Sequence, residues 1–150
     1  MVRFVFGTAI DCEPVRLRRR RWMPFQPAGV VMAPGGHLHF PPGSPHWSDD
    51  FTQADSALQG LFIHEMTHVW QAQVHGRWYL PLRRPFSRRY AYSLHPGWPL
   101  ERYGIEQQAE IVRHAYLLRT GHSLAGVADE RAYDLLVNFP GAQAMGMREG

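Results

Sequence analysis

Residues 55–76 constrain the fold most, because their apolar side chains recur at helical spacing along two separate stripes. One stripe is formed by Leu58, Leu61, Phe62, Val69 and Ala72, with the polar Glu65 in line with them, and the other by Ile63, Met66, Trp70 and Val74. This spacing predicts a helix, and two apolar stripes indicate that the helix is covered on most sides. Asp55 or Ser56 is the expected N-cap, and Gly76 is the expected end. We therefore expect this helix at the centre of the molecule.

Three polar residues, His64, Glu65 and His68, lie within this apolar helix as the motif HExxH in "FIHEMTHVWQ". Residues four apart share a helix face, so the two imidazoles can reach one point. Zinc binds neutral imidazole nitrogens and leaves a position for water, whose proton Glu65 could accept. The alternative is a pair of core histidines, which would also bury a carboxylate at high cost. We predict Zn²⁺ bound by His64 and His68, with Glu65 as general base.

A second helix is predicted over residues 103–121, where helical spacing continues until Gly121. Its "IEQQAE" segment places Glu106 and Glu110 four apart on one face. One glutamate can be the third metal ligand, while the other accepts the N–H of a ligating histidine. We expect Glu106 to be the ligand and Glu110 the supporting acceptor, with the reverse order as the alternative. Without HExxH, a solvated helix face would explain both glutamates.

Other histidines are weaker candidates for metal binding. His37 and His39 alternate along an expected strand and so point to one face, but ordinary surface or core positions explain them. A third histidine ligand close after the motif would require a pattern such as HExxHxxGxxH. The chain has "HEMTHVWQAQVH", which lacks both the glycine and the histidine at those positions. A glutamate is therefore the expected third ligand.

Hydrolysis of an amide also needs a group that stabilises the oxyanion. Residues 77–100 carry four prolines and are expected to form an irregular excursion, with a short strand at "RRYAYSL". The candidates in or near this excursion are Tyr90, Tyr92, Tyr103 and His95. Of these we expect Tyr92, and after it Tyr103, to place a side chain over the site. The alternative is that these tyrosines pack under a loop. The strand expected at "HLHF" offers a backbone edge for an extended peptide.

The rest of the chain is expected to form a small sheet and one short helix. β-branched and aromatic residues predict strands at "RFVFGTA" and "EPVRLRR", while "GVVMA" and "HLHF" flank a turn as in a hairpin. "ADERAYDLLVNF" reads as a helix that Pro140 and Gly141 end. The 150 residues suit a single domain, 1–150. The predicted class is α+β, with a small N-terminal β-sheet packed on the two helices.

Charge and composition argue against several classes of protein. The net charge of +3 is modest, and the arginine clusters at 18–21 and 83–89 lack the interleaved aromatics and glycines of an RNA-binding motif. Nucleic-acid binding is therefore not expected. No apolar run approaches the length needed to cross a bilayer, and we see no cleavable signal. Cys12 is the only cysteine, so no internal disulfide forms. We expect synthesis in the cytoplasm.

The segments "GLFIHEMTHVWQ" and "YGIEQQAEIV" resemble a bacterial family of small HExxH proteins described as Vgr-related. That family is similar to metallopeptidase-like domains, typically marked "HELTHVVQQ", that accompany contractile injection systems and Rhs proteins. "VRLRRRRW" and "GVVMAPGGHLHFPPGS" extend the resemblance over most of the chain. It implies a minimal zincin with a small sheet, an active-site helix and a glutamate helix. The glutamate-zincin pattern ExxAD matches "EQQAE" with Glu106 as ligand and departs from it at Glu110.

Together, the residues and the resemblance predict a zinc-dependent metallopeptidase that hydrolyses peptide bonds of a peptide or protein substrate through metal-activated water. The alternative is a non-catalytic accessory or binding module of a contractile secretion apparatus that retains a zincin scaffold. The resemblance also implies a Vgr-type or Rhs-type partner and export by a specialised secretion system. It does not indicate which substrate is cleaved.

Overall fold

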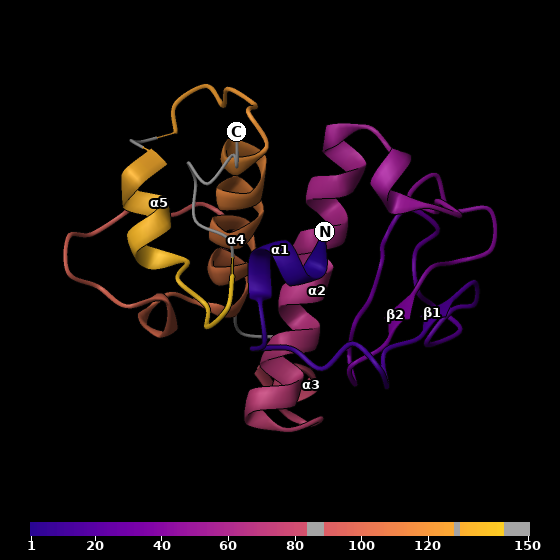
Figure 1. The fold of residues 1–150 in the computed structure, drawn as a ribbon. Coiled ribbons are helices and arrows are strands. Elements are labelled where there is room, and N and C mark those ends of the chain that lie inside the picture. The colour runs from indigo at the N-terminus through magenta and orange to yellow at the C-terminus, as the bar shows by residue number, and fades with distance from the viewer. Residues whose placement is uncertain (84–88, 128–129, 143–150) are drawn as a thin grey trace.

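The structure is a computed structural model that describes residues 1–83, 89–127 and 130–142. Within these residues, helices predominate and one two-stranded sheet completes an α+β fold. The longest helix runs through the middle of the molecule, with the sheet on one side and two further helices on the other (Figure 1). No helix in the described part of the chain is long and apolar enough to cross a membrane.

The predicted central helix is confirmed as α2 (Ser56–His75). The Asp55 side chain caps it by accepting a hydrogen bond of 2.8 Å from the backbone N–H of Leu58. Gly76 follows its last residue with a φ of 91°, a conformation that favours glycine. All residues from 63 to 72 are buried, as two apolar stripes require.

Helix α4 (Ile105–Arg119) packs directly against α2 and confirms the second predicted helix. Gly60 lies at the crossing, where a Cβ would be only 3.1 Å from the Arg113 side chain. The Tyr116 hydroxyl donates a hydrogen bond of 2.6 Å to Gln59 and ties the helices together. The small residue thus lets the two backbones approach closely.

The last described helix, α5 (Glu130–Leu136), lies against the outer side of α4 (Figure 1). Arg119 at the end of α4 binds it through an ion pair of 2.7 Å with Asp134. The same guanidinium donates to the backbone oxygen of Val137, 2.6 Å away. A short helix after Gly121 was predicted, and the structure contains one.

The sheet is smaller than the sequence predicts. Strands β1 (Leu17–Arg18) and β2 (Leu38–His39) pair in parallel, and Met32 makes one antiparallel bridge to His39. Strands were predicted around both segments, but the predicted hairpin is reduced to the Met32 bridge. Because β2 is paired on both sides, its edge cannot accept an extended peptide.

The predicted strand at "RFVFGTA" is wrong, because Val2–Phe6 forms the short helix α1. Val5 and Phe6 are adjacent in sequence and both fully buried, whereas a strand would alternate between buried and exposed positions. Phe6 contacts Phe139 with ring centroids 5.1 Å apart. Packing against the C-terminal half thus outweighs local β propensity.

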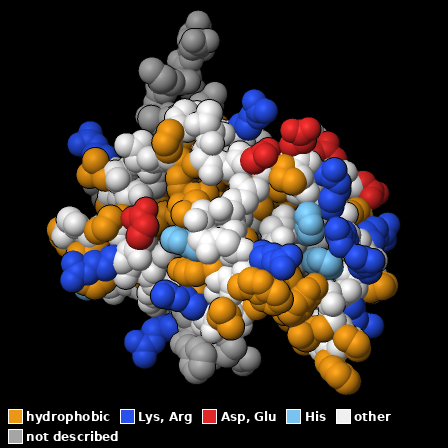
Figure 2. All heavy atoms as spheres, turned by 90° about the horizontal axis from the view of Figure 1, so that it is seen from below, with side chains coloured by type: hydrophobic (Ala, Val, Ile, Leu, Met, Phe, Trp, Pro, Cys, Tyr) orange, Lys and Arg blue, Asp and Glu red, His pale blue; other side chains and the backbone are white. Residues whose placement is uncertain are grey.

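The excursion after α2 begins with the short helix α3 (Tyr79–Arg83) and ends with the 3₁₀ turn η3 (Leu100–Arg102). Of the strand predicted at "RRYAYSL", residue 88 lies outside the described residues and residues 89–94 form no strand. Seen from below, the molecule shows hydrophobic and basic side chains next to one another on its surface (Figure 2). The exposed hydrophobic residues include Phe25 and Trp78.

Candidate metal centre

The packing of α2 on α4 brings two histidines and a glutamate together. The Nε2 atoms of His64 and His68 lie 3.3 and 3.2 Å from the same oxygen, Oε2 of Glu106. All three possible ligand atoms are within 4.8 Å of one another, and all three residues are buried. The structure thus brings together the residues predicted as ligands, and the group could bind a metal ion.

A buried amide determines how His68 faces this group. Gln71 Nε2 donates to the backbone oxygen of Ile105 at 3.1 Å and to Gln108 Oε1 at 2.9 Å. This orientation leaves Gln71 Oε1 facing His68 Nδ1 at 2.9 Å. Because an amide oxygen can only accept, Nδ1 carries the hydrogen, and the lone pair of Nε2 points toward Glu106.

Glu110 determines how the other histidine, His64, faces the group. Its Oε1 lies 2.8 Å from His64 Nδ1, and its carboxylate also meets Arg113 at 3.4 Å. Burial alone would raise the pKa of Glu110, but His64 and Arg113 outweigh burial and hold the pKa below its usual value. The negative charge of Glu110 beside Nδ1 favours a hydrogen on that nitrogen, so the Nε2 lone pair of His64 also points inward.

In this cluster, hydrogen-bond acceptor atoms of three side chains face one another, and such an arrangement attracts a cation. Two imidazole lone pairs face the Glu106 oxygen, which is unfavourable unless a positive charge lies between them. Burial lowers the pKa of His64, but Glu106 and Glu110 overcome it and raise the pKa to about 9. Without a metal, a proton on His64 supplies the charge. With a metal, the donor set of two imidazoles and one carboxylate fits a catalytic zinc site.

Glu65 follows the first histidine on α2 and is buried. Among the described residues, no group hydrogen-bonds its Oε2 atom. A buried carboxylate oxygen without a partner is costly in an ordinary core. It is suited to accept a proton from a water molecule, which is the role that the sequence predicts for Glu65.

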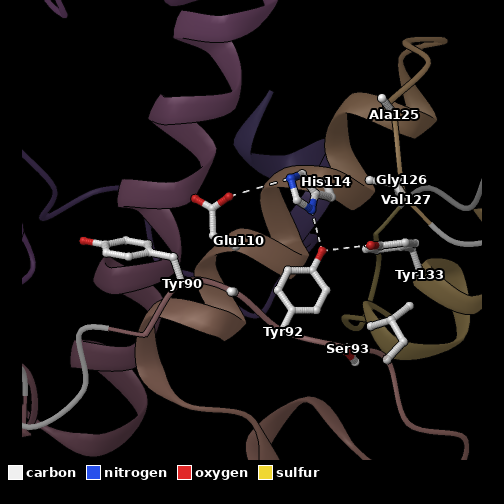
Figure 3. Close-up of a pocket in the computed structure, with 11 residues that line it drawn as sticks. Tyr90, Tyr92, Ser93, Glu110, His114, Ala125, Gly126, Val127 and Tyr133 are labelled. Carbon is white, nitrogen blue, oxygen red and sulfur yellow. Dashed lines mark hydrogen bonds and ion pairs between the residues drawn. The ribbon is translucent and has the colours of Figure 1, made fainter.

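The two predicted tyrosines lie in different surroundings. The Tyr103 hydroxyl accepts a hydrogen bond of 2.9 Å from the backbone of His95 and is buried. The Tyr92 hydroxyl hydrogen-bonds His114 and Tyr133 at the side of a cavity next to Glu110 (Figure 3). These contacts place Tyr92 near the site but leave its predicted role a prediction.

Two residues of the site were not predicted from the sequence, and a third, Tyr90, was ranked behind Tyr92 and Tyr103. The Tyr90 ring stacks on the His64 ring with centroids 6.2 Å apart. Gln71 and Gln108 form the buried amide pair described above. Gln71 follows His68 at a spacing of three, which on a helix places it beside that histidine, and this spacing was the available signal.

His39 lies on strand β2 and His37 directly precedes it, so both belong to a different environment. Burial is the main cause that lowers the pKa of each, and Arg18 lowers it further. Neither is in the group whose ligand atoms converge in the described part of the chain. Cys12 is exposed and free.

Comparison with known proteins identifies relatives of this chain. No protein-family model matches it. It is 41% identical over 145 residues to the type VI secretion system spike protein VgrG2b of Pseudomonas aeruginosa PAO1. That match covers 91% of this chain but only 14% of the spike protein's length. The solved structure of the effector domain of P. aeruginosa VgrG2b is similar, with a TM-score of 0.69 and 35% identity. The match covers 91% of this chain and 77% of that domain.

Proposed function

Because the chain belongs to the family of the VgrG2b effector domain, we propose that it is a zinc-dependent metallopeptidase exported by a specialised secretion system. The relationship itself is consistent with a secretion-associated module. The observation that carries the enzymatic part is the buried group of His64, His68 and Glu106, whose lone pairs converge. A peptide or protein is the proposed substrate, and a Vgr-type protein is the proposed partner.

In this proposal, His64, His68 and Glu106 hold the zinc ion, and Glu110 orients His64 through the ion pair with its Nδ1 atom. Helices α2 and α4 would then be the active-site and glutamate helices of a minimal zincin. When bound, zinc lowers the pKa of a coordinated water toward about 7 and polarises the substrate carbonyl. The neighbouring buried residues exclude other water from the site.

Glu65 is the proposed general base and acid. Its unpartnered oxygen would accept a proton from the attacking water and return a proton to the leaving amine. The oxyanion would be stabilised by a tyrosine hydroxyl. Tyr90 becomes the first candidate, because its ring lies against His64, and Tyr92 stays the alternative because its hydroxyl already binds His114 and Tyr133. Comparing Tyr90→Phe with Tyr92→Phe distinguishes the two.

The test of this function combines metal content with peptide cleavage. We expect the purified protein to contain close to one zinc per chain. Glu65→Gln should retain the metal and lose cleavage by about 100-fold or more, since general-base catalysis typically contributes that much. Glu101→Gln is the matched control, because Glu101 is exposed on η3. An ordered protein that binds no zinc, or a Glu65→Gln variant that cleaves normally, contradicts the proposal.

A second candidate is a non-catalytic binding module that retains the scaffold. The observation that favours it is the surface, where Phe25 is 91% and Trp78 62% exposed. The face shown in Figure 2 also carries hydrophobic side chains next to basic ones. In that case Glu65→Gln would leave the biological phenotype unchanged. Substitution of the exposed Arg83, or of Trp47, whose ring is partly buried against Phe40 and Phe51, would instead abolish binding of a secretion-system partner.

A further inference from the structure

A cavity of about 590 Å³ opens beside the candidate metal centre. Its walls are residues 90–94 on one side and 125–127 on the other, and its base includes Glu110, His114 and Tyr133. Glu110 also contacts His64, so the cavity and the metal centre share a residue. The volume is many times the roughly 30 Å³ that one water molecule occupies, so a large side chain fits.

The hydrogen bonds at the base of this cavity run in one direction. Glu110 Oε1 lies 2.8 Å from His64 Nδ1, and Glu110 Oε2 lies 3.7 Å from His114 Nε2. The negative charge of the carboxylate therefore favours the His114 tautomer that carries its hydrogen on Nε2. His114 Nδ1 is then an acceptor and takes the hydrogen of the Tyr92 hydroxyl. Because the Tyr92 hydrogen is then used, Tyr92 accepts from the Tyr133 hydroxyl, 2.8 Å away; Figure 3 marks this contact with a dashed line.

With the hydrogen bonds in this direction, Tyr133 is the last residue of the series, and its oxygen is left as a free acceptor. Each hydroxyl has a single hydrogen, and the hydrogens of Tyr92 and Tyr133 are both used within the protein. The Tyr133 oxygen can still accept a hydrogen bond, but it cannot donate one. A molecule in the cavity therefore satisfies Tyr133 only if it carries an N–H or O–H group.

The residues at the base are uncharged except for Glu110. Burial raises the pKa of Tyr92 and of Tyr133, so both hydroxyls stay protonated. Burial also lowers the pKa of His114, which keeps the imidazole neutral. A carboxylate entering the cavity would meet Glu110 and an acceptor oxygen, and would be repelled.

The wall formed by residues 91–93 carries unpaired backbone groups. The backbone oxygen of Ala91 accepts from Gln107 at 2.7 Å. In the part of the chain that the structure describes, the backbone N–H groups of Ala91, Tyr92 and Ser93 donate to no other residue. Exposed backbone of this kind can pair with an extended peptide.

We propose that this cavity is the substrate's side-chain pocket, and that it selects an uncharged side chain with a hydrogen-bond donor, such as glutamine or tyrosine. The peptide backbone lies along residues 91–93, and the selected side chain donates to the Tyr133 oxygen. This inference rests on the proposed peptidase function and specifies its substrate class. It replaces the strand at "HLHF" as the expected peptide-binding edge.

The test separates binding from cleavage by using the zinc-loaded Glu65→Gln protein to capture peptides from a proteome-derived library. Mass spectrometry of the bound peptides should show one position enriched in glutamine and tyrosine and depleted in aspartate and glutamate. A labelled peptide pair that differs only by glutamine or methionine at that position should differ about fivefold in affinity, as one neutral hydrogen bond allows.

Two pocket variants in the same background make the test specific. Tyr133→Phe should reduce the ratio of the two peptides' affinities from about five to about one, because it removes the acceptor oxygen. Val127→Trp should fill the pocket and remove the positional enrichment. Val74→Trp is the matched control, since Val74 is exposed on α2 away from the cavity.

The outcomes for the pocket and for the peptidase are distinguishable. Equal affinity for the peptide pair, or enrichment that survives Val127→Trp, overturns the pocket. Selective capture that depends on Val127 and Tyr133 supports it, whether or not the wild-type protein cleaves the captured peptides. If captured peptides remain intact with wild-type protein, the pocket stands and the peptidase function fails.

Discussion

At the scale of single residues, Gln71 has the clearest indirect effect on the candidate metal centre. It is fully buried and connects His68 to the Ile105 backbone and to Gln108. Because the backbone oxygen fixes the orientation of the amide, the tautomer of His68 follows from the fold. Supporting acceptors of this kind raise ligand basicity and keep the ring in place.

The first prediction concerns this amide. Gln71→Met keeps the length of the side chain but removes its acceptor and both donors. We expect a 10- to 100-fold loss of zinc affinity, the usual cost of removing such a support. Competition with a chromophoric chelator measures the dissociation constant. Gln53→Met, at an exposed position, is the control, and equal zinc affinity of the two variants would show that Gln71 has no orienting role.

The second prediction concerns protons at His64. Its pKa in the metal-free protein is raised to about 9, above the usual 6.5. The raised pKa therefore stabilises the metal-free fold below pH 6.5, and this contribution disappears as the pH rises through 9. Zinc needs the neutral imidazole, so its binding tightens over the same range. Calorimetry at pH 7 in buffers of different ionisation enthalpy should detect release of close to one proton; no release would contradict it.

At the scale of elements, the crossing of α2 and α4 determines whether the ligands meet. Gly60 faces α4, and a larger side chain there has to displace the Arg113 and Leu117 side chains. His64 is one turn further along α2 than Gly60, so a displacement at the crossing reaches the ligands. The metal centre is therefore sensitive to helix spacing as well as to its own residues.

The third prediction tests this spacing. Gly60→Leu should destabilise the fold by about 1–3 kcal/mol, the typical cost of overpacking a buried position. It should also weaken zinc binding, because α2 and α4 each contribute ligands. Urea unfolding and chelator competition measure the two effects. Ala57→Leu, at an exposed position on the same helix, should change neither, and a Gly60→Leu variant that behaves like it would refute the close crossing.

At the scale of the whole molecule, the proposed zinc ion would link α2 with the C-terminal helices. A ligand that binds only the folded state stabilises it by mass action. At 100 times its dissociation constant, this amounts to about 2.7 kcal/mol. The ion would therefore contribute a substantial part of the net stability of a chain of this size.

The fourth prediction follows from that linkage. Removing zinc with a chelator should lower the melting temperature by about 5–10 °C for a chain of this size. His68→Ala should abolish the difference between metal-free and zinc-loaded protein. His122→Ala, which changes an exposed histidine outside the cluster, should preserve it. Identical melting curves for the wild-type protein with and without zinc would argue against a metal that bridges the helices.

Local periodicity explains which parts of this molecule the sequence determined. The bounds of α2 and the face shared by His64 and His68 depend on residues within a few turns of each other. The same holds for Glu106 and Glu110 on α4. Local spacing therefore predicted which side chains share a face on each helix, while the packing of α2 on α4 brings the two sets together. The chemical roles of these residues stay proposals.

Contacts between distant segments were decided only by the tertiary structure. Residues 2–6 form a helix because Phe6 packs on Phe139, and no local pattern encodes that contact. Gln71 hydrogen-bonds Gln108, which is 37 positions away in the sequence, and Tyr92 hydrogen-bonds Tyr133, which is 41 positions away. A side chain's hydrogen-bond partners depend on which segments fold against it, so the histidine tautomers and the acceptor pocket appear only in three dimensions.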